Sequence, residues 1–161
     1  MERKTPLYQT HVDAGGKIVE FGGFLMPVQY PTGVLAEHMA VRQKAGLFDV
    51  SHMGELRLKG PDAVANVQKL ITADISTMQD GDIKYAMFCN DAGGILDDFI
   101  VYRCAADDYW LVVNAGNRDK DAAWVESHLF GDVDYRDEGD DWGQVLSLIH
   151  ISEPTRLALI S

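Results

Sequence analysis

Two adjacent carboxylates lie inside a segment whose other residues favour a β-strand. Asp97 and Asp98 follow the Gly93-Gly94 pair and precede the β-branched and aromatic run 99–102. Aspartate is depleted in strands, and a carboxylate buried without a partner costs several kcal/mol. The pattern therefore indicates either a functional site or, alternatively, an edge strand with both acids in solvent.

The period of a strand separates the two carboxylates. Successive side chains of a strand point to opposite faces of the sheet. One face therefore carries Asp98, Ile100 and Tyr102, and the opposite face carries Asp97, Phe99, Val101 and Arg103. The first face combines a carboxylate with an aliphatic and an aromatic side chain, which could line a slot for a flat aromatic ring.

The elements that would position this strand alternate irregularly between helix and strand. Apolar spacing predicts helices over residues 33–45, 60–71 and 117–129, with Pro61 in the first turn of the second and Asn117 as the cap of the third. Strands are predicted at residues 17–21, 54–59, 84–90, 95–104, 109–113 and 132–136, and the remainder of residues 5–31 is expected to be irregular. The absence of repeated βαβ units favours an α+β fold, an antiparallel sheet with flanking helices.

Composition and charge exclude several classes of partner. The chain has 161 residues and a net charge of −11, without a cluster of lysine or arginine. Nucleic acids and anionic membranes both reward basic patches, so neither is expected as a partner. No apolar run approaches the roughly 18 residues of a membrane span, and the N-terminus lacks an apolar signal core. We therefore expect a cytoplasmic protein.

Several residues that could do chemistry are better explained as structural. Cys89 and Cys104 lack the spacing of a metal site and are expected to be two buried free thiols. Ser51 and His52 could form part of a nucleophilic site, but nothing in the sequence supplies the orienting third group, so structural hydrogen bonding is favoured. His38 lies in the apolar stripe of its helix, and a hydrogen-bonded core or boundary histidine is favoured there over a catalytic one.

Several motifs carry a family resemblance. The segment 93–103, GGILDDFIVYR, together with FDVSHM at 48–53 and VVNA at 112–115, resembles the glycine cleavage system T-protein family, the aminomethyltransferases. The segments 4–8 and 21–30 resemble the same family in the same order. The resemblance extends from about Lys4 to about Val145 and covers less than half of a full-length member.

The resemblance implies an activity and a set of site residues. The fold would be a truncated, folate-binding aminomethyltransferase-like domain. The activity would be transfer of a methylene group from the aminomethyl-lipoyl arm of the H-protein to tetrahydrofolate, with release of ammonia and without a metal. Asp98 matches the family's functional acid, and the expected folate-contacting residues are Met53, Tyr85, Ile100, Tyr102, Trp110 and Asn114. Without the resemblance, Met53, Tyr85 and Trp110 would be assigned to the core.

The same resemblance divides the chain. Residues 1–50 would begin a discontinuous first domain, 51–130 would form the folate-site subdomain, and 131–145 would return to the first domain. Residues 146–161 resemble translated adapter sequence, although a genuine strand is the alternative.

Two alternative functions are a folate-binding relative linked to iron–sulfur maintenance and the folate domain of a sarcosine or dimethylglycine oxidising enzyme. The segments at 48–55 and 93–103 favour the transferase.

Overall fold

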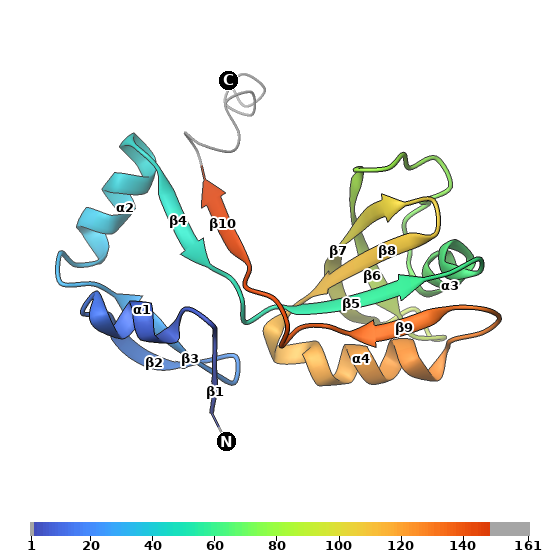
Figure 1. Ribbon diagram of the computed structural model, residues 1–161, viewed down its shortest axis with the longest axis horizontal. Coiled ribbons are helices and arrows are strands. Elements are labelled where there is room, and N and C mark those ends of the chain that lie inside the picture. The colour runs from blue at the N-terminus through green and yellow to red at the C-terminus, as the bar shows by residue number, and fades with distance from the viewer. Residues whose placement is uncertain (1, 149–161) are drawn as a thin grey trace. The chain divides into compact units, whose positions relative to one another are not determined.

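The computed structural model describes residues 2–148, which form two compact units. The first unit contains the described residues up to His52 together with 143–148, and the second contains Met53–Trp142 (Figure 1). Both combine helices with small sheets whose strand pairs are antiparallel except for one short parallel pair. The α+β class predicted from the sequence is therefore confirmed.

The first unit is built from two small sheets and two helices. Its helices are α1 (Tyr8–Asp13) and α2 (Val34–Gln43). Its three-stranded sheet has the order β1 (Arg3–Lys4), β3 (Phe24–Gln29), β2 (Lys17–Phe21), and its two-stranded sheet pairs β4 (Gly46–Asp49) with β10 (Val145–Leu148).

Four elements of this unit were not predicted, namely β1, α1, β3 and β4. Strand 17–21 is confirmed, but α1 and β3 occupy segments expected to be irregular. A proline in a central strand removes a ladder hydrogen bond. In the structure β1 pairs only with Phe24 and Leu25, so Pro27 lies beyond its end, and the pairing with β2 is irregular beside it.

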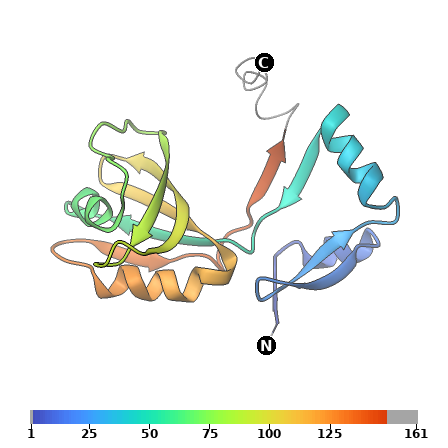
Figure 2. The same cartoon turned by 180° about the vertical axis from the view of Figure 1, so that it is seen from behind.

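The second unit is a five-stranded antiparallel sheet with two helices. The strand order is β6 (Ile83–Cys89), β7 (Ile95–Ala105), β8 (Asp108–Val113), β5 (Gly54–Lys59), β9 (Asp134–Asp137). The helices are α3 (Ala63–Leu70) and α4 (Arg118–Ser127), and the short 3-10 turn η1 (Ala115–Asn117) precedes α4. Figures 1 and 2 show α4 running alongside the β5–β9 edge.

The core of the second unit lies on one face of this sheet. Leu56, Leu58, Phe99, Val101 and Leu111 point to that face and pack in one buried cluster with α3 and with Val125 of α4. Burial of a side chain of this size contributes about 1.5–3 kcal/mol. The opposite face is more open, because Ile83 and Tyr85 are 59% and 61% exposed. The second face is therefore available for a site.

Some predicted details were wrong. Helix α2 has no buried residue, so the stripe expected to be buried from Val34 is exposed. Pro61 precedes α3 instead of occupying its first turn. Asn117 is the residue before α4, but its side chain makes no capping hydrogen bond. Both cysteines are free as expected, yet Cys104 is exposed.

The division of the chain also differs in detail from the expected boundaries. Strand β9 pairs with β5, so the second unit continues past residue 130 to Trp142. The proposed foreign tail falls almost wholly outside the described residues. Its first three, 146–148, lie in β10, which pairs with β4. Within residues 2–148, no helix is long and apolar enough to cross a membrane.

Candidate functional site

The residues singled out from the sequence lie on one face of the second unit's sheet. Strand pairing places Tyr85 opposite Ile100 and Ile100 opposite Val112, and it places Tyr102 opposite Trp110. Directly paired residues of antiparallel strands share a face. Asn114 follows the end of β8, and Met53 immediately precedes β5, which begins with the pair Gly54–Val113. The sheet therefore places five of the seven candidates on one face, and Asn114 and Met53 lie at its rim. The five are Asp98, Tyr85, Ile100, Tyr102 and Trp110.

The alternation predicted for the central strand is observed. Asp97, Phe99 and Val101 are buried on the helix-covered face, whereas Asp98 is exposed and Ile100 is partly exposed on the other. The Tyr85 hydroxyl donates a hydrogen bond to the Asp98 carboxylate. This bond and the negative charge of Asp98 raise the pKa of Tyr85, because ionisation would place two anions side by side. Asp98 thus presents a carboxylate at the edge of an aromatic and aliphatic surface.

Asn114 connects the two aspartates. Its side-chain amide donates to the Asp97 carboxylate at 3.0 Å and to the Asp98 carbonyl at 2.7 Å. Its backbone N–H also points to Asp97, at 3.3 Å. The sequence predicted Asn114 as a polar site residue, and the structure shows that its amide is committed to the backbone and carboxylate of the strand.

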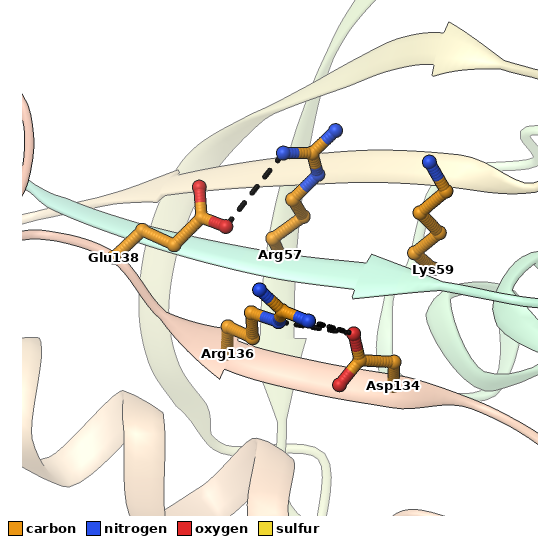
Figure 3. A pocket seen from close by; sticks show the side chains of 5 residues that line it. All are labelled: Arg57, Lys59, Asp134, Arg136 and Glu138. Carbon is orange, nitrogen blue, oxygen red and sulfur yellow. Dashed lines mark hydrogen bonds and ion pairs between the residues drawn. The ribbon is translucent and has the colours of Figure 1, made fainter.

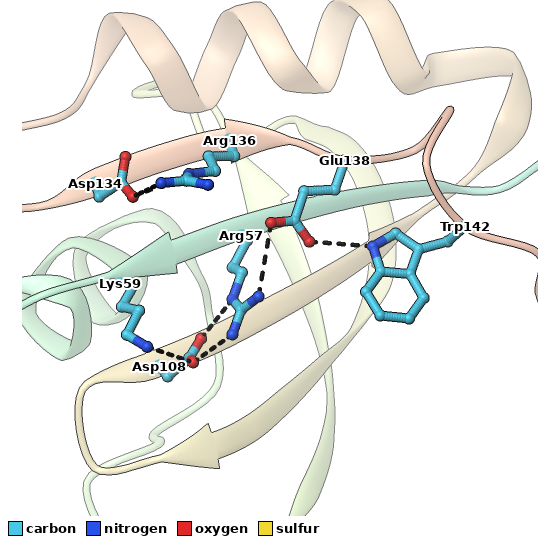
Figure 4. A network of polar contacts seen from close by, with 7 residues as sticks. All are labelled: Arg57, Lys59, Asp108, Asp134, Arg136, Glu138 and Trp142. Carbon is cyan, nitrogen blue, oxygen red and sulfur yellow. Dashed lines mark hydrogen bonds and ion pairs between the residues drawn. The ribbon is translucent and has the colours of Figure 1, made fainter.

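Trp110 is held by a polar network that the sequence did not reveal. Trp142 packs edge-on against it with ring centroids 4.8 Å apart, and the Arg57 guanidinium lies 5.6 Å from the Trp110 ring centroid. Arg57 donates two hydrogen bonds to Asp108, at 2.9 and 2.6 Å, and the Trp142 indole N–H donates to Glu138 at 3.1 Å (Figure 4). These contacts fix the orientation of the Trp110 ring. The only hint in the sequence was the alternation of charged and apolar residues in β5.

Beside this network lies a shallow hollow of about 160 Å³. Figure 3 shows its lining on β5 and at β9: Arg57, Lys59, Asp134, Arg136 and Glu138. Arg136 pairs with Asp134 at 2.8 Å, and Arg57 faces Glu138 at 3.6 Å. Since these cations have acidic neighbours, the hollow offers no excess charge to an anion, and we treat it as the support of Trp110.

Glu55 is a further carboxyl on the site face. It lies opposite Val112 and therefore in the same row of the sheet as Ile100 and Tyr85. It is 4% exposed, and neither carboxylate oxygen has a hydrogen-bond partner among the described residues. Burial raises the pKa of Glu55 to about 7; Arg118 opposes the shift, and Asp137 and Asp140 add to it.

The Glu55 environment predicts a pH-dependent stability. The unfolded chain ionises Glu55 near its ordinary pKa of 4.5, whereas the folded chain does so at about 7. Glu55 keeps its proton to a higher pH in the folded state than in the unfolded state. The stability contributed by the neutral form is therefore complete below about pH 4.5 and is lost by about pH 7. The loss corresponds to about 3 kcal/mol.

Urea unfolding of the wild-type chain and of Glu55→Gln over this pH range measures the effect. We expect the free energy of unfolding of the variant to rise relative to wild type as pH increases. Glu126→Gln, at an exposed glutamate of α4, is the matched control and should show no such trend. Parallel pH profiles for wild type and Glu55→Gln would contradict the prediction.

The first unit contains a second polar cluster in a cavity of about 400 Å³. His11 bridges the Tyr30 hydroxyl at 2.7 Å and the Asp49 carboxylate at 2.8 Å, and Thr5 donates to Asp49 at 2.7 Å. Ser51 donates its backbone N–H to the other Asp49 oxygen at 3.0 Å. Each of these groups already has a partner, so the cluster is a structural network, as predicted for Ser51.

Comparisons with known proteins identify a family. A family model described as the GCVT N-terminal domain matches residues 7–148. The aminomethyltransferase of Desulfitobacterium hafniense is 50% identical over 144 residues, which cover 89% of this chain and 39% of that protein. That of Bacillus licheniformis is 43% identical over 160 residues, 99% of this chain and 43% of the relative.

A solved structure has a similar fold. The crystal structure of glycine cleavage system aminomethyltransferase T from Bartonella henselae superposes with a TM-score of 0.79 at 38% identity. The match covers 92% of this chain and 38% of that one. The chain therefore spans about two fifths of the length of these relatives.

Proposed function

The chain belongs to the GCVT N-terminal domain family, and from this premise we propose that it is the N-terminal part of a tetrahydrofolate-dependent aminomethyltransferase. The whole enzyme would accept an aminomethyl group from the lipoyl arm of the H-protein, pass the methylene carbon to tetrahydrofolate and release ammonia. We further propose that it works in the cytoplasm. The shared name of the matched relatives favours this function over a folate-binding protein without transferase activity.

The observation that carries the proposal is the Asp98 surface. A reduced folate has a flat heteroaromatic ring with N–H donors along one edge. Ile100, Tyr102 and Trp110 provide a surface on which such a ring could pack, and Asp98 provides an acceptor beside it. The residue types therefore fit the ligand.

The chemistry asks for a fixed carboxylate. The folate supplies the nitrogen that attacks the methylene carbon, and Asp98 would accept a hydrogen bond from the ring and assist proton transfer. Its position on a strand, with its backbone carbonyl bonded to Asn114, restricts where the carboxylate can lie. Tyr85 would have to release Asp98 or share it when the ring binds, because its hydroxyl occupies one carboxylate oxygen.

Binding can be tested on the chain itself by NMR titration with 5-formyltetrahydrofolate, a stable reduced folate. Because only part of the relatives' length is present, we expect weak binding, with a Kd of about 1 mM. Amide shifts should concentrate on β7 and at Asn114. p-Aminobenzoylglutamate, which lacks the bicyclic ring, is the control ligand and should leave these resonances unmoved. Shifts confined to the first unit would contradict the proposal.

A further inference from the structure

The end of β7 that carries Asp98 is held only partly by the sheet. Towards β6, the register shifts by one residue at Leu96, which lies between two paired residues of β7 and has no partner of its own. Such a bulge interrupts the ladder and redirects the neighbouring side chains. Towards β8, the paired register of the described residues begins only at Ile100, so Asp98 lies outside it. Hydrogen bonds other than those of the ladder must therefore fix this end of the strand.

Asn117 holds the residue before Asp98 on the buried side of the sheet. Its side-chain amide donates to the Asp97 carboxylate at 2.8 Å, and the same oxygen accepts from the Asn114 amide at 3.0 Å. Asp97 is only 6% exposed, so both bonds are shielded from water. Hydrogen bonds to an ionised carboxylate are stronger than those between neutral groups. Asn117 therefore ties β7 firmly to the N-terminal end of α4.

Lys120 holds the bulge itself. This residue is exposed in the first turn of α4, and its ammonium donates to the Leu96 carbonyl at 2.6 Å. A cation in the first turn of a helix is opposed by the helix dipole, so the stability of α4 does not account for a lysine here. The bond to Leu96 does account for it, because it gives the carbonyl of the bulged residue a charged donor.

Asn114 completes the set of contacts. Its amide donates to the Asp98 carbonyl at 2.7 Å, so each of the three successive residues 96–98 accepts a hydrogen bond from a side chain of segment 114–120. Because the three donors belong to η1, its flanking residues and the first turn of α4, they hold the end of the strand as one piece. The Asp98 carboxylate points to the opposite face, where it accepts from the Tyr85 hydroxyl.

We propose that Asn117 and Lys120 are positioning residues for Asp98: they clamp the bulged end of β7 to α4 and so fix where the Asp98 carboxylate stands on the open face. An acid that must accept a hydrogen bond and assist proton transfer works only within a narrow geometry, which such a clamp maintains. The inference rests on the proposed function only in naming Asp98 as the acid. The clamp itself belongs to the chain as it is, so it can be measured without a folate.

The experiment compares Asn117→Ala and Lys120→Met with the wild-type chain by NMR. The first readout is the backbone order parameter of residues 96–98, which should be about 0.85 in wild type and should fall towards about 0.6 in each variant. The second is the ring-carbon resonance of Tyr85, whose hydroxyl reports on the Asp98 carboxylate. It should shift in both variants, because the carboxylate no longer holds one position. A loss of core packing alone would not move this exposed ring.

Two further variants separate positioning from general destabilisation. Lys120→Arg keeps a charged donor, so it should restore the wild-type values of both readouts. Lys44→Met, at an exposed lysine of the first unit, should match wild type. If Asn117→Ala fails to fold, Lys120→Met and Lys120→Arg decide alone, since a change at an exposed side chain leaves the core intact.

Order parameters at residues 96–98 that stay at the wild-type value in Lys120→Met overturn the inference. A Tyr85 resonance that stays unmoved while the order is lost overturns it equally. Either result leaves the proposed function intact, because neither measurement involves a folate. The expected changes in both readouts, together with a folate titration that shifts no resonance on β7, would support the clamp and count against the proposed function alone.

Discussion

Replacing Asp98 by asparagine should lower the rate of methylene transfer by ~10²–10⁴-fold, the usual cost of losing a positioned proton acceptor. Asparagine keeps the size of the side chain and can still accept from Tyr85, so the surface formed by Ile100, Tyr102 and Trp110 should survive. What it lacks is a negative charge and the ability to take a proton. The melting temperature should therefore change little while the rate falls.

The measurement needs an enzyme of full family length. A suitable protein joins residues 1–145 of this chain to the remaining part of the Desulfitobacterium hafniense aminomethyltransferase, since the chain matches 39% of that protein. Steady-state transfer from aminomethylated H-protein to tetrahydrofolate gives the rate. The prediction depends on the unmodified chimera being active, which is the positive control.

Asp97→Asn is the comparison that assigns the role. Asp97 accepts from the side chains of Asn114 and Asn117, and an amide in its place would bring N–H groups against these donors. We expect this variant to lower the melting temperature by roughly 4 °C or more, about 1 kcal/mol for a domain of this size. Equal and mild rate losses in the two variants would show that Asp98 is not the catalytic acid.

The sequence was sufficient to orient the central strand, because alternation depends only on the two-residue period of β structure. It correctly placed Asp98 with Ile100 and Tyr102 and put Asp97 on the opposite face, which the structure shows to be buried. It could not show how a buried Asp97 is tolerated. That answer lies in Asn114 and Asn117, which are distant in sequence and meet it only when the segment around η1 packs against β7.

Tertiary contacts also explain the errors. Asn117 looked like a helix cap, but its side-chain N–H donates to Asp97 and its side chain makes no capping hydrogen bond. Trp142 and Glu55 gave no motif, because their importance comes from tertiary contacts: pairing of β5 with β8 places Glu55 opposite Val112, and Trp142 packs against Trp110. The α2 stripe follows a helical period, yet none of its residues is buried within the described part of the chain. A periodic pattern predicts an apolar face without identifying what covers it.

The 161-residue chain by itself should have no measurable transferase activity. Its first unit leaves large apolar side chains in solvent, since Val34, Leu35 and Met39 of α2 and Leu47 and Phe48 of β4 are all exposed. Solved relatives are more than twice as long, and this chain covers 38% of the Bartonella henselae enzyme. We expect the missing length to cover this surface and to close the site over Asp98. An open site admits water and cannot hold the two reactants in a fixed relative orientation.

The test is a turnover assay of the purified chain beside the chimera, with isothermal titration of the reduced folate into each. The chimera should bind the folate at least tenfold more tightly, a difference of about 1.4 kcal/mol, because it supplies walls that the chain lacks. The chain alone should also associate or bind a hydrophobic dye through its exposed patch. The matched variant is Leu35→Asp on α2, made in both proteins. If this face is covered in the longer protein, the variant chimera should lose stability. In the 161-residue chain the same change should reduce association without lowering stability. Micromolar folate binding together with turnover by the 161-residue chain would show that the Asp98 surface is complete without any further segment.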